Sequence, residues 1–545
     1  MPESYARSSR RTMSLRAGRL LPCLLLLLGG LATQPPPVTA TPLAPDVGAS
    51  LAELHSSLSD GRDPRAVRAF RAVGTIEMGG QVVGTTRTVA ARNPPALREV
   101  LEMAGVRQVA VLIGDEAWFE DPNGSVRSAT GDELASYRLA HSLLFHTYLE
   151  GEVPGFDLQR EPGALRFLPQ QDGAARVLEL ADDEEGRLLP SLLRQRQQGA
   201  EITTTFEDWR TFDGVRMPFR SVQSSGDARF DLVLTTTGVE MPDALDPDEI
   251  LPLLAGSHPA DAALLDPERA ASIPLRRFGA LLMVQAEVNG HETTFLIDTG
   301  AGATVLSSRL ADRLSLSRRG VVEARGAGGS EAGGYVDLAR LSLPGVEIRD
   351  QTVVVLPLGP LRDATGHEVD GILGYDFLSR FALEIDYAHK TLGLFALGGY
   401  APRDCSSRVD LRVEANVPRI QATVDGIHGG NFVLDLGNAT SLVLHTSFAA
   451  EHGYLDRAGD ASFSLSGIGG SEAMSRVTVG SLALGDVVFR EVPAVIARSG
   501  EGVLALEESL GNVGGDLFDG AVVAFDYSEG ALWVCPASAD SASGR

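Results

Sequence analysis

Two aspartates in the C-terminal half of the chain stand in near-copies of one pattern. Asp298 lies in FLIDTGAGATVL and Asp435 in FVLDLGNATSLVL, so each follows an apolar run and precedes a glycine by two positions. Glycine permits a tight bend that leaves the carboxylate projecting. Two carboxylates within about 3 Å cannot both ionise, because like charges in a partly dry site push their pKa values apart. One then acts as general base and the other as general acid around a shared water, which suits attack on a peptide carbonyl.

Both aspartates belong to a longer internal repeat. GAGGSEA, beginning at Gly326, recurs as GIGGSEA, beginning at Gly467, and ILGYDFLSRFALEIDY recurs as NVGGDLFDGAVVAFDY. Three motifs that recur in the same order at nearly equal offsets indicate two homologous lobes fused in one chain. We place the lobes at residues 273–402 and 403–537, with a tail at 538–545.

Each lobe is expected to position its aspartate in the same way. A hairpin ends in the apolar strand that delivers the aspartate to the turn, and a glycine-rich hairpin then follows, mobile enough to cover a groove. An apolar-apolar-Gly strand, ILG in lobe one, then runs into a short helix and a final hairpin. The whole chain is therefore predicted to be mainly β.

In these motifs the chain resembles the retropepsin-like aspartic proteases, in particular their tandem, exported bacterial form. Lobe one carries the most specific match, with Asp298-Thr299-Gly300 followed by Thr304-Val305-Leu306 and later by DGILG. The resemblance covers residues 273–537 and implies two tandem β-barrel lobes that form a pepsin-like bilobal domain. It also implies that Asp298 and Asp435 are the catalytic carboxylates.

The resemblance assigns supporting roles to further residues. The residues implied to support the active site are Thr299, Gly300, Ile372, Leu373 and Gly374 in lobe one, and Leu436 and Gly437 in lobe two. The residues implied to form the covering flaps are Gly326, Ala327, Gly328 and Gly329 in lobe one, and Gly467, Ile468, Gly469 and Gly470 in lobe two.

Lobe two departs from the family pattern, because Leu436 replaces Thr or Ser and NVG replaces ILG. In the family, the hydroxyl after each catalytic aspartate bonds to backbone across the lobe interface, and Leu436 cannot do so. Losing such a bond costs about 1 kcal/mol, or about 1–3 kcal/mol if a dry acceptor is left unpaired.

Three hypotheses remain open. Asp298 and Asp435 form a working pair within one chain; lobe two is a support and the protein binds peptides or lipidated ligands without cutting them; or Asp298 meets its twin in a second chain.

The N-terminal half has a different pattern. Residues 61–245 alternate short apolar runs with turn pairs, which predicts an antiparallel sheet. Helices are expected in DPRAVRAFRAV and in DELASYRLAHSLLFHTYLEG. The region resembles the lipoprotein-carrier and outer-membrane lipoprotein-sorting fold in its order of helix, GTI strand, GDEAWFEDPNG hairpin, helix and DWRTFDGVRMPFRSV hairpin. This resemblance implies a groove for a lipid acyl chain or an extended peptide; the alternative is a packing module without a ligand. A proline-rich linker at residues 246–272 is expected to make few contacts.

The first residues predict export. Arginines precede the apolar run LLPCLLLLLGGL and small residues follow it, which is the layout of a signal peptide at residues 1–40, cleaved after Ala40 or, alternatively, after Ala32. An uncleaved membrane anchor is the other interpretation. Residues 41–60 are rich in Ala, Pro and Ser and are expected to form a tether.

Two of the three cysteines remain after cleavage, and in a secreted or periplasmic protein Cys405 and Cys535 are predicted to pair.

Charge and missing motifs exclude other functions. The net charge of −25 would be repelled by a nucleic-acid backbone, so no nucleic-acid partner is expected. The chain contains no P-loop, GxSxG, HExxH or Cys-x-x-Cys motif, and neither a cofactor nor a metal is expected. The expected partner is a peptide or protein substrate. The expected state is a monomer, and a homodimer is the alternative.

Overall fold

The structure is a computed structural model. It describes residues 47–535 except 152, 171–172, 198–199, 401, 403–404, 406, 461–462, 499–501 and 506–508. The predicted signal peptide, the first part of the predicted tether and the tail at 538–545 lie outside the described residues. Within the described part of the chain, no helix has the length and apolar character needed to span a membrane.

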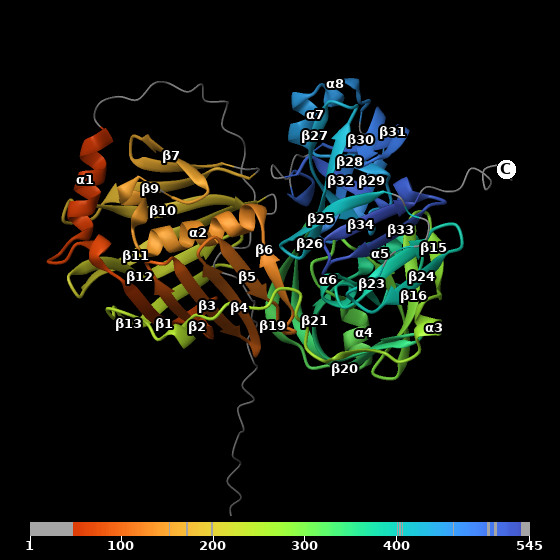
Figure 1. Ribbon diagram of the computed structural model, residues 1–545, viewed down its shortest axis with the longest axis horizontal. Helices are drawn as coiled ribbons and strands as arrows, with labels where there is room; N and C mark the ends of the chain where they lie inside the picture. The colour runs from red at the N-terminus through yellow and green to blue at the C-terminus, as the bar shows by residue number, and fades with distance from the viewer. Residues whose placement is uncertain are drawn as a thin grey trace, which may run out of the picture.

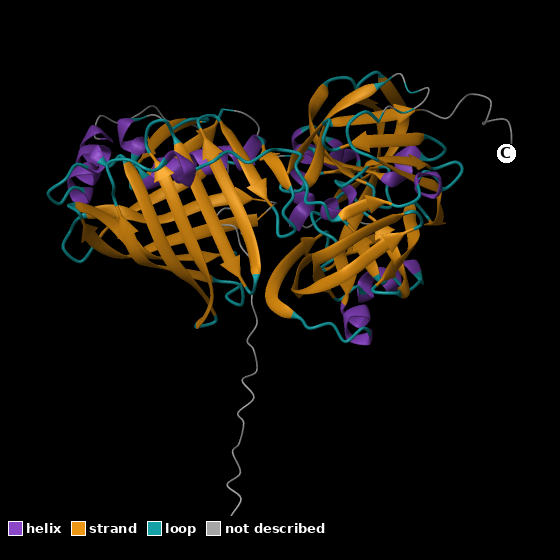
Figure 2. Ribbon diagram, turned by 60° about the horizontal axis from the view of Figure 1, so that its bottom comes forward, coloured by secondary structure: helices purple, strands orange, loops and turns teal. Residues whose placement is uncertain are grey.

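The N-terminal half is a single antiparallel sheet of thirteen strands, in the order β6-β5-β4-β3-β2-β1-β13-β12-β11-β10-β9-β8-β7. Helix α2 (Gly131–Leu144) packs against this curved sheet (Figures 1 and 2), so both the sheet and this helix are as predicted. The strands are β1 Ala69–Met78, β2 Gln81–Ala91, β3 Ala96–Met103, β4 Val106–Ile113, β5 Glu116–Glu120, β6 Val126–Ala129, β7 Phe156–Glu161, β8 Ala164–Pro169, β9 Arg176–Asp182, β10 Leu188–Gln197, β11 Ala200–Phe212, β12 Val215–Ser224 and β13 Leu232–Glu240.

The other predicted N-terminal helix is wrong. DPRAVRAFRAV forms a 3₁₀ turn at Pro64–Ala66 and then enters strand β1. This strand pairs with β2 on one side and β13 on the other, so pairing on both edges outweighs the helical spacing of its apolar residues.

The predicted tether is also wrong within the described residues. Val47–Leu58 forms helix α1, and its Leu51, Leu54 and Leu58 are buried in a cluster with Tyr148 and Phe156. Three leucines at helical spacing therefore bury one face of a segment whose composition suggested a loose chain.

The predicted linker makes many contacts rather than few. Glu249 pairs with Arg71 of the N-terminal sheet, and Asp261 pairs with Arg380 of lobe one. Strand β14 (Ala262–Leu264) joins the lobe-one sheet beside β21, and α3 (Pro267–Ala270) follows it. The segment therefore ties the N-terminal half to lobe one.

Each lobe repeats one series of hairpins around its aspartate, as the internal repeat predicted. The lobe-one elements are β15 Ile273–Phe278, β16 Leu281–Val288, β17 His291–Ile297, β18 Val305–Ser307, α4 Ser308–Arg313, β19 Arg319–Gly326, β20 Gly329–Leu343, β21 Val346–Leu356, α5 Gly359–Thr365, β22 Gly371–Leu373, α6 Tyr375–Leu378, β23 Ala382–Asp386 and β24 Thr391–Phe395. The lobe-two elements are β25 Arg408–Glu414, β26 Val417–Val424, β27 His428–Asp435, β28 Leu442–Leu444, α7 Thr446–Glu451, α8 Tyr454–Arg457, β29 Phe463–Gly467, β30 Gly470–Leu484, β31 Val487–Ala497, β32 Gly511–Gly514, β33 Val522–Asp526 and β34 Ala531–Cys535.

A sheet shared between the lobes joins them within the chain. Strand β23 of lobe one pairs antiparallel with β33 of lobe two, with Leu383 opposite Phe525 and Ile385 opposite Val523. Strands β24 and β15 continue the sheet on one side, and β34 and β25 continue it on the other. All four of these paired side chains are fully buried, so the interface is part of the common core. Lobe one therefore pairs with lobe two of the same chain.

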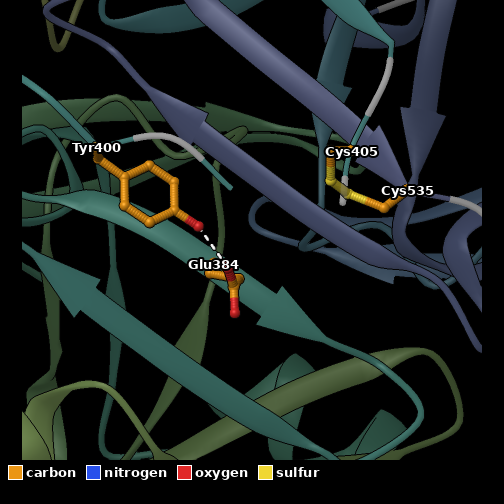
Figure 3. The surroundings of a disulfide bond; sticks show 4 residues. All are labelled: Glu384, Tyr400, Cys405 and Cys535. Carbon is orange, nitrogen blue, oxygen red and sulfur yellow. Dashed lines mark hydrogen bonds between the residues drawn. A yellow bond between two sulfur atoms is a disulfide. The ribbon is translucent and has the colours of Figure 1, made fainter. Parts of the chain in front are cut away.

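The predicted disulfide between Cys405 and Cys535 is present, with a Cα–Cα distance of 5.0 Å (Figure 3). It links the segment that enters lobe two to the end of β34. Near it, the Tyr400 hydroxyl donates a hydrogen bond to the Glu384 carboxylate on β23. The disulfide therefore joins the two ends of lobe two at the edge of the shared sheet.

Removing the disulfide is expected to destabilise lobe two. The cysteines are separated by 130 residues, and cross-links over long loops restrict the unfolded chain most, by about 2–4 kcal/mol in typical proteins. The double variant Cys405→Ser/Cys535→Ser should therefore unfold at lower urea concentration than the wild type, and reductant should shift only the wild type. An unchanged midpoint would show that the shared sheet alone holds lobe two.

Candidate active site

Two equivalent strand pairs carry the aspartates to the lobe interface. In lobe one, a turn with positive φ at Asn289 and Gly290 reverses the chain into β17, which runs parallel to β22. The Asp298 amide donates to the Leu373 carbonyl at 3.1 Å, so β22 holds the start of the turn. In lobe two, β27 runs parallel to β32 in the same way.

The glycines that follow allow the turns to approach closely. A Cβ added to Gly374 would lie 2.3 Å from the Ala303 carbonyl oxygen, so ILG needs its glycine to pass beneath the aspartate turn. Across the interface, a Cβ on Gly437 would lie 2.2 Å from the Asp298 carboxyl carbon. A Cβ on Gly300 would lie 2.7 Å from the Asp435 carboxyl carbon. Each carboxylate thus rests against the glycine of the opposite lobe, and the structure brings the two predicted aspartates together.

The electrostatics of the two carboxyls differ. Burial, and after it the negative charge of Asp435, raise the pKa of Asp298 well above its usual range, while the Gly300 amide donates to it at 2.8 Å. Burial also raises the pKa of Asp435, but hydrogen bonds from Asn512 and from Asp298 act in the opposite direction. This pattern leaves Asp298 as the proton-bearing member and Asp435 as the member that ionises first.

Thr299 makes the cross-lobe contact that the resemblance of the chain to retropepsin-like proteases implied. Its hydroxyl donates to the Leu434 carbonyl at 2.6 Å and accepts from the Leu436 amide at 2.9 Å. Thr299 is fully buried, so both bonds are made away from water. One side chain of lobe one therefore holds the backbone on both sides of Asp435.

Leu436 supplies no reciprocal bond and is instead fully buried in the apolar cluster that spans both lobes. Apolar packing thus replaces a polar contact in this half of the interface.

Replacing Leu436 with threonine is expected to raise kcat/KM or leave it unchanged, because the new hydroxyl can hold lobe one as Thr299 holds lobe two. The free energy of unfolding is expected to change little. The new hydrogen bond contributes about 1 kcal/mol, and the loss of buried apolar area offsets it. Leu436→Val is the matched control, since it loses volume without gaining a hydroxyl. A marked loss of activity in Leu436→Thr but not in Leu436→Val would contradict this account.

Lobe two has Asn512 and His445 where lobe one has Ile372 and Ser307. Asn512 lies on β32 at the register of Ile372, and its amide nitrogen lies 3.0 Å from Asp435 Oδ2. His445 lies before α7, where Ser307 lies before α4, and its Nε2 is 2.8 Å from Asn512 Oδ1. The departure NVG was recognised in the sequence, but the contact of Asn512 with Asp435 was not predicted.

The glycine-rich segments form hairpins that meet at their tips. Gly328 donates its amide to the Ile468 carbonyl at 3.1 Å. A Cβ on Gly328 would lie 2.1 Å from the backbone of Gly470, and one on Gly469 would lie 2.2 Å from that of Gly329. Only glycine permits this approach at Gly328 and Gly469. The two segments assigned to flaps therefore meet each other, with Gly326 and Gly467 at the strand ends and Ala327 packed at the tip.

The N-terminal half also reaches the active-site loop. Asn416 of lobe two donates its side-chain amide to the Gly302 carbonyl at 3.1 Å and accepts from Arg127 Nε at 2.5 Å. Arg127 also forms a buried, two-point ion pair with Glu133 of α2. The N-terminal half, lobe one and lobe two thus meet at Gly302, which lies four residues after Asp298. Sequence reasoning missed this contact, because isolated polar residues in loops give no signal of their partners.

No group of three or more His, Cys, Asp or Glu side chains with the arrangement of a metal site occurs among the residues that the structure covers. His258, on the linker, bonds instead to Ser125 at 2.9 Å.

Comparison with known proteins agrees with the geometry. Residues 284–377 and 420–513 each match the aspartyl protease family model. The UBA domain-containing protein Mud1 of Schizosaccharomyces pombe is 27% identical over 151 residues, which are 27% of this chain and 39% of that protein. DNA damage-inducible protein 1 of Eremothecium gossypii is 30% identical over 118 residues, 21% of this chain and 22% of that protein. The protein of the same name from Candida glabrata is 31% identical over 117 residues, 21% of this chain and 25% of that protein.

The chain therefore spans less than two fifths of each of these relatives. Among solved structures, an aspartic proteinase from Irpex lacteus aligns with a TM-score of 0.36 and 14% identity, over 50% of this chain and 99% of that one. The two family matches contain Asp298 and Asp435 at equivalent positions. Each lobe therefore contains a segment similar to the aspartyl protease family, and the two segments lie in tandem.

Proposed function

We propose that the chain is an aspartic endopeptidase whose Asp298 and Asp435 activate one water for attack on a peptide carbonyl. The observation that carries the proposal is the pair of buried carboxyls, each resting against the glycine of the opposite lobe. Asp435 takes the proton of the attacking water, and Asp298 donates its proton to the carbonyl oxygen. The reaction needs no metal and forms no covalent intermediate with the enzyme.

The test is cleavage of a defined peptide library by the full chain, with products identified by mass spectrometry between pH 3 and pH 9. We expect cleavage at internal bonds that is blocked by a peptide carrying a hydroxyethylene group in place of the cut bond. Absence of cleavage at every pH, together with binding of uncut peptides, would instead favour the alternative of a peptide- or lipid-binding pseudoprotease with a degenerate second lobe.

Activity is expected within a pH window bounded by the two carboxyls. Activity should rise as Asp435 ionises, at a pH above the usual pKa range of an aspartate. It should fall at still higher pH, as Asp298 loses its proton. A carboxyl whose pKa is raised by folding stabilises the folded state in acid, and this contribution is lost as pH rises through the folded-state pKa. Asp298→Asn should therefore gain stability relative to wild type as pH increases, as measured by urea unfolding. A pH-independent difference would contradict the assigned protonation.

A second candidate function concerns the N-terminal half, which we propose binds an apolar chain. A cavity of about 270 Å³ lies between α2 and the sheet, lined by apolar side chains such as Phe70, Leu139 and Phe206. Gln195 lines it too and is 2% exposed, and its side-chain amide finds no partner among the described residues. A buried amide of this kind is costly unless a ligand satisfies it.

The ligand class that fits is an acyl chain or extended peptide with one carbonyl or amide group. Displacement of an apolar fluorescent probe by a fatty acid amide would test this, with Leu139→Trp filling the cavity. Equal probe binding by Leu139→Trp would rule the cavity out.

We also propose export through a signal peptide at residues 1–40, which N-terminal sequencing of the secreted or periplasmic protein would test.

A further inference from the structure

The two carboxyls of the pair have unequal surroundings, and the inequality originates in lobe two. In lobe one the strand position of Asn512 is held by Ile372, which can offer no hydrogen bond, whereas Asn512 reaches Asp435 with its amide. Both strands are buried, so neither contact is replaced by bulk water. A donor on only one of two otherwise equivalent carboxylates favours ionisation of that one.

The hydrogen bonds of His445 agree with one orientation of the Asn512 amide. Its Nδ1 lies 2.8 Å from the Ser509 carbonyl oxygen, which only accepts, so this nitrogen carries a proton. With the Asn512 amide oriented so that its Oδ1 lies 2.8 Å from Nε2, this nitrogen donates as well. The ring then carries two protons, and the Asn512 NH₂ group is left to point at Asp435 Oδ2.

The opposite orientation of the amide has a different consequence. If the ring were neutral, with Nε2 bare, the NH₂ of Asn512 would turn toward Nε2 and its oxygen toward Asp435. Two oxygens would then face each other unless Asp435 itself carried a proton. The state of the His445 ring and the ionisation of Asp435 are therefore coupled through one side chain.

We propose that Asn512 and His445 are positioning residues that make Asp435 the ionised carboxylate of the pair, with the Asn512 amide donating to Asp435 and a doubly protonated His445 ring holding that amide in place. The inference rests on the proposed peptidase function, yet its geometry does not depend on the substrate. Asp298 is the titratable group in contact with Asp435, and Tyr527 in turn interacts with Asp298. His445 is fully buried, which disfavours a charged ring, and the ionised Asp435 that it faces through Asn512 acts in the opposite direction.

The activity test uses Asn512→Ile and His445→Ser, which install the lobe-one residues. Loss of one hydrogen bond of about 1.4 kcal/mol corresponds to about one pH unit, so we expect the acid limb of kcat/KM to move up by about that amount in each variant. Because both act through one chain of contacts, the double variant should shift no further than Asn512→Ile alone. His445→Gln, which keeps a donor for Asn512 Oδ1, should restore part of the shift.

The matched control is Thr446→Val, which removes a hydroxyl bonded to the Ala497 carbonyl beside His445. It should leave the pH profile unchanged. Additive shifts in the double variant, or an unshifted acid limb in Asn512→Ile, would overturn the proposal.

A second measurement needs neither a variant nor peptidase activity. In histidine-labelled wild-type protein, the ¹⁵N spectrum of His445 should show two protonated ring nitrogens over the pH range in which Asp435 is ionised. A neutral ring over that range would overturn the proposal. If the protein cuts no peptide but shows the doubly protonated ring, the peptidase function fails while the coupled arrangement stands.

Discussion

Replacing either Asp298 or Asp435 with asparagine is expected to lower kcat/KM by about 10²–10⁴-fold or more, which is the contribution of a positioned acid or base. Asparagine keeps the shape of aspartate but can neither take nor give the proton. Because the two carboxyls act as one unit, the double variant should lose little more than either single variant. Initial rates on one peptide from the library, measured at the optimum pH, would provide the comparison.

The control is Asp312→Asn, on the exposed face of α4, where the carboxylate pairs with solvent-facing Arg318. It should leave the rates unchanged. Loss of activity in Asp298→Asn with full activity in Asp435→Asn would contradict the paired mechanism, and would show that lobe two is a scaffold or that lobe one pairs with a second chain.

Thr299→Val is expected to produce the largest loss of stability at the site. The substitution preserves shape but strands the Leu434 carbonyl and the Leu436 amide, both of which depend on the Thr299 hydroxyl. Each unsatisfied buried group costs about 1–3 kcal/mol, so the free energy of unfolding should fall by about 2–6 kcal/mol. Looser spacing of the carboxyls should lower kcat/KM at least about 10-fold as well. Urea unfolding and initial rates measure the two effects.

Thr293→Val is the matched control, since Thr293 is also buried but its hydroxyl bonds to the Ala286 carbonyl within its own hairpin. It should cost less stability and leave kcat/KM unchanged. Equal effects on activity from the two substitutions would show that the cross-lobe contact has no special role in holding Asp435.

The sequence predicted the protease-like half well, because its signal is a repeat. Asp435 was found from its offset to Asp298, and the structure brings the two together. The flap tips followed from glycine-rich segments, and the structure shows why glycine is needed at Gly328 and Gly469. The cysteine pair followed from the expected oxidising compartment, and its geometry is confirmed.

The remaining features depend on contacts between residues distant in the chain. Asn512 looked like a defect in a strand motif, and its role emerged only when β32 placed it beside Asp435. Helix α1 and the linker looked like loose chain because their few apolar or charged residues find partners far away, as Glu249 does with Arg71. The contact from Arg127 through Asn416 to Gly302 likewise joins three separate parts of the chain.

The central claim is that one chain forms one complete site from Asp298 and Asp435. It is tested most directly by isothermal titration of the full chain with the best-cut peptide rebuilt around a hydroxyethylene group, which mimics the attacked carbonyl. The account predicts one inhibitor bound per chain, with binding lost in Asp435→Asn. Half an inhibitor per chain, or undiminished binding by Asp435→Asn, would contradict it.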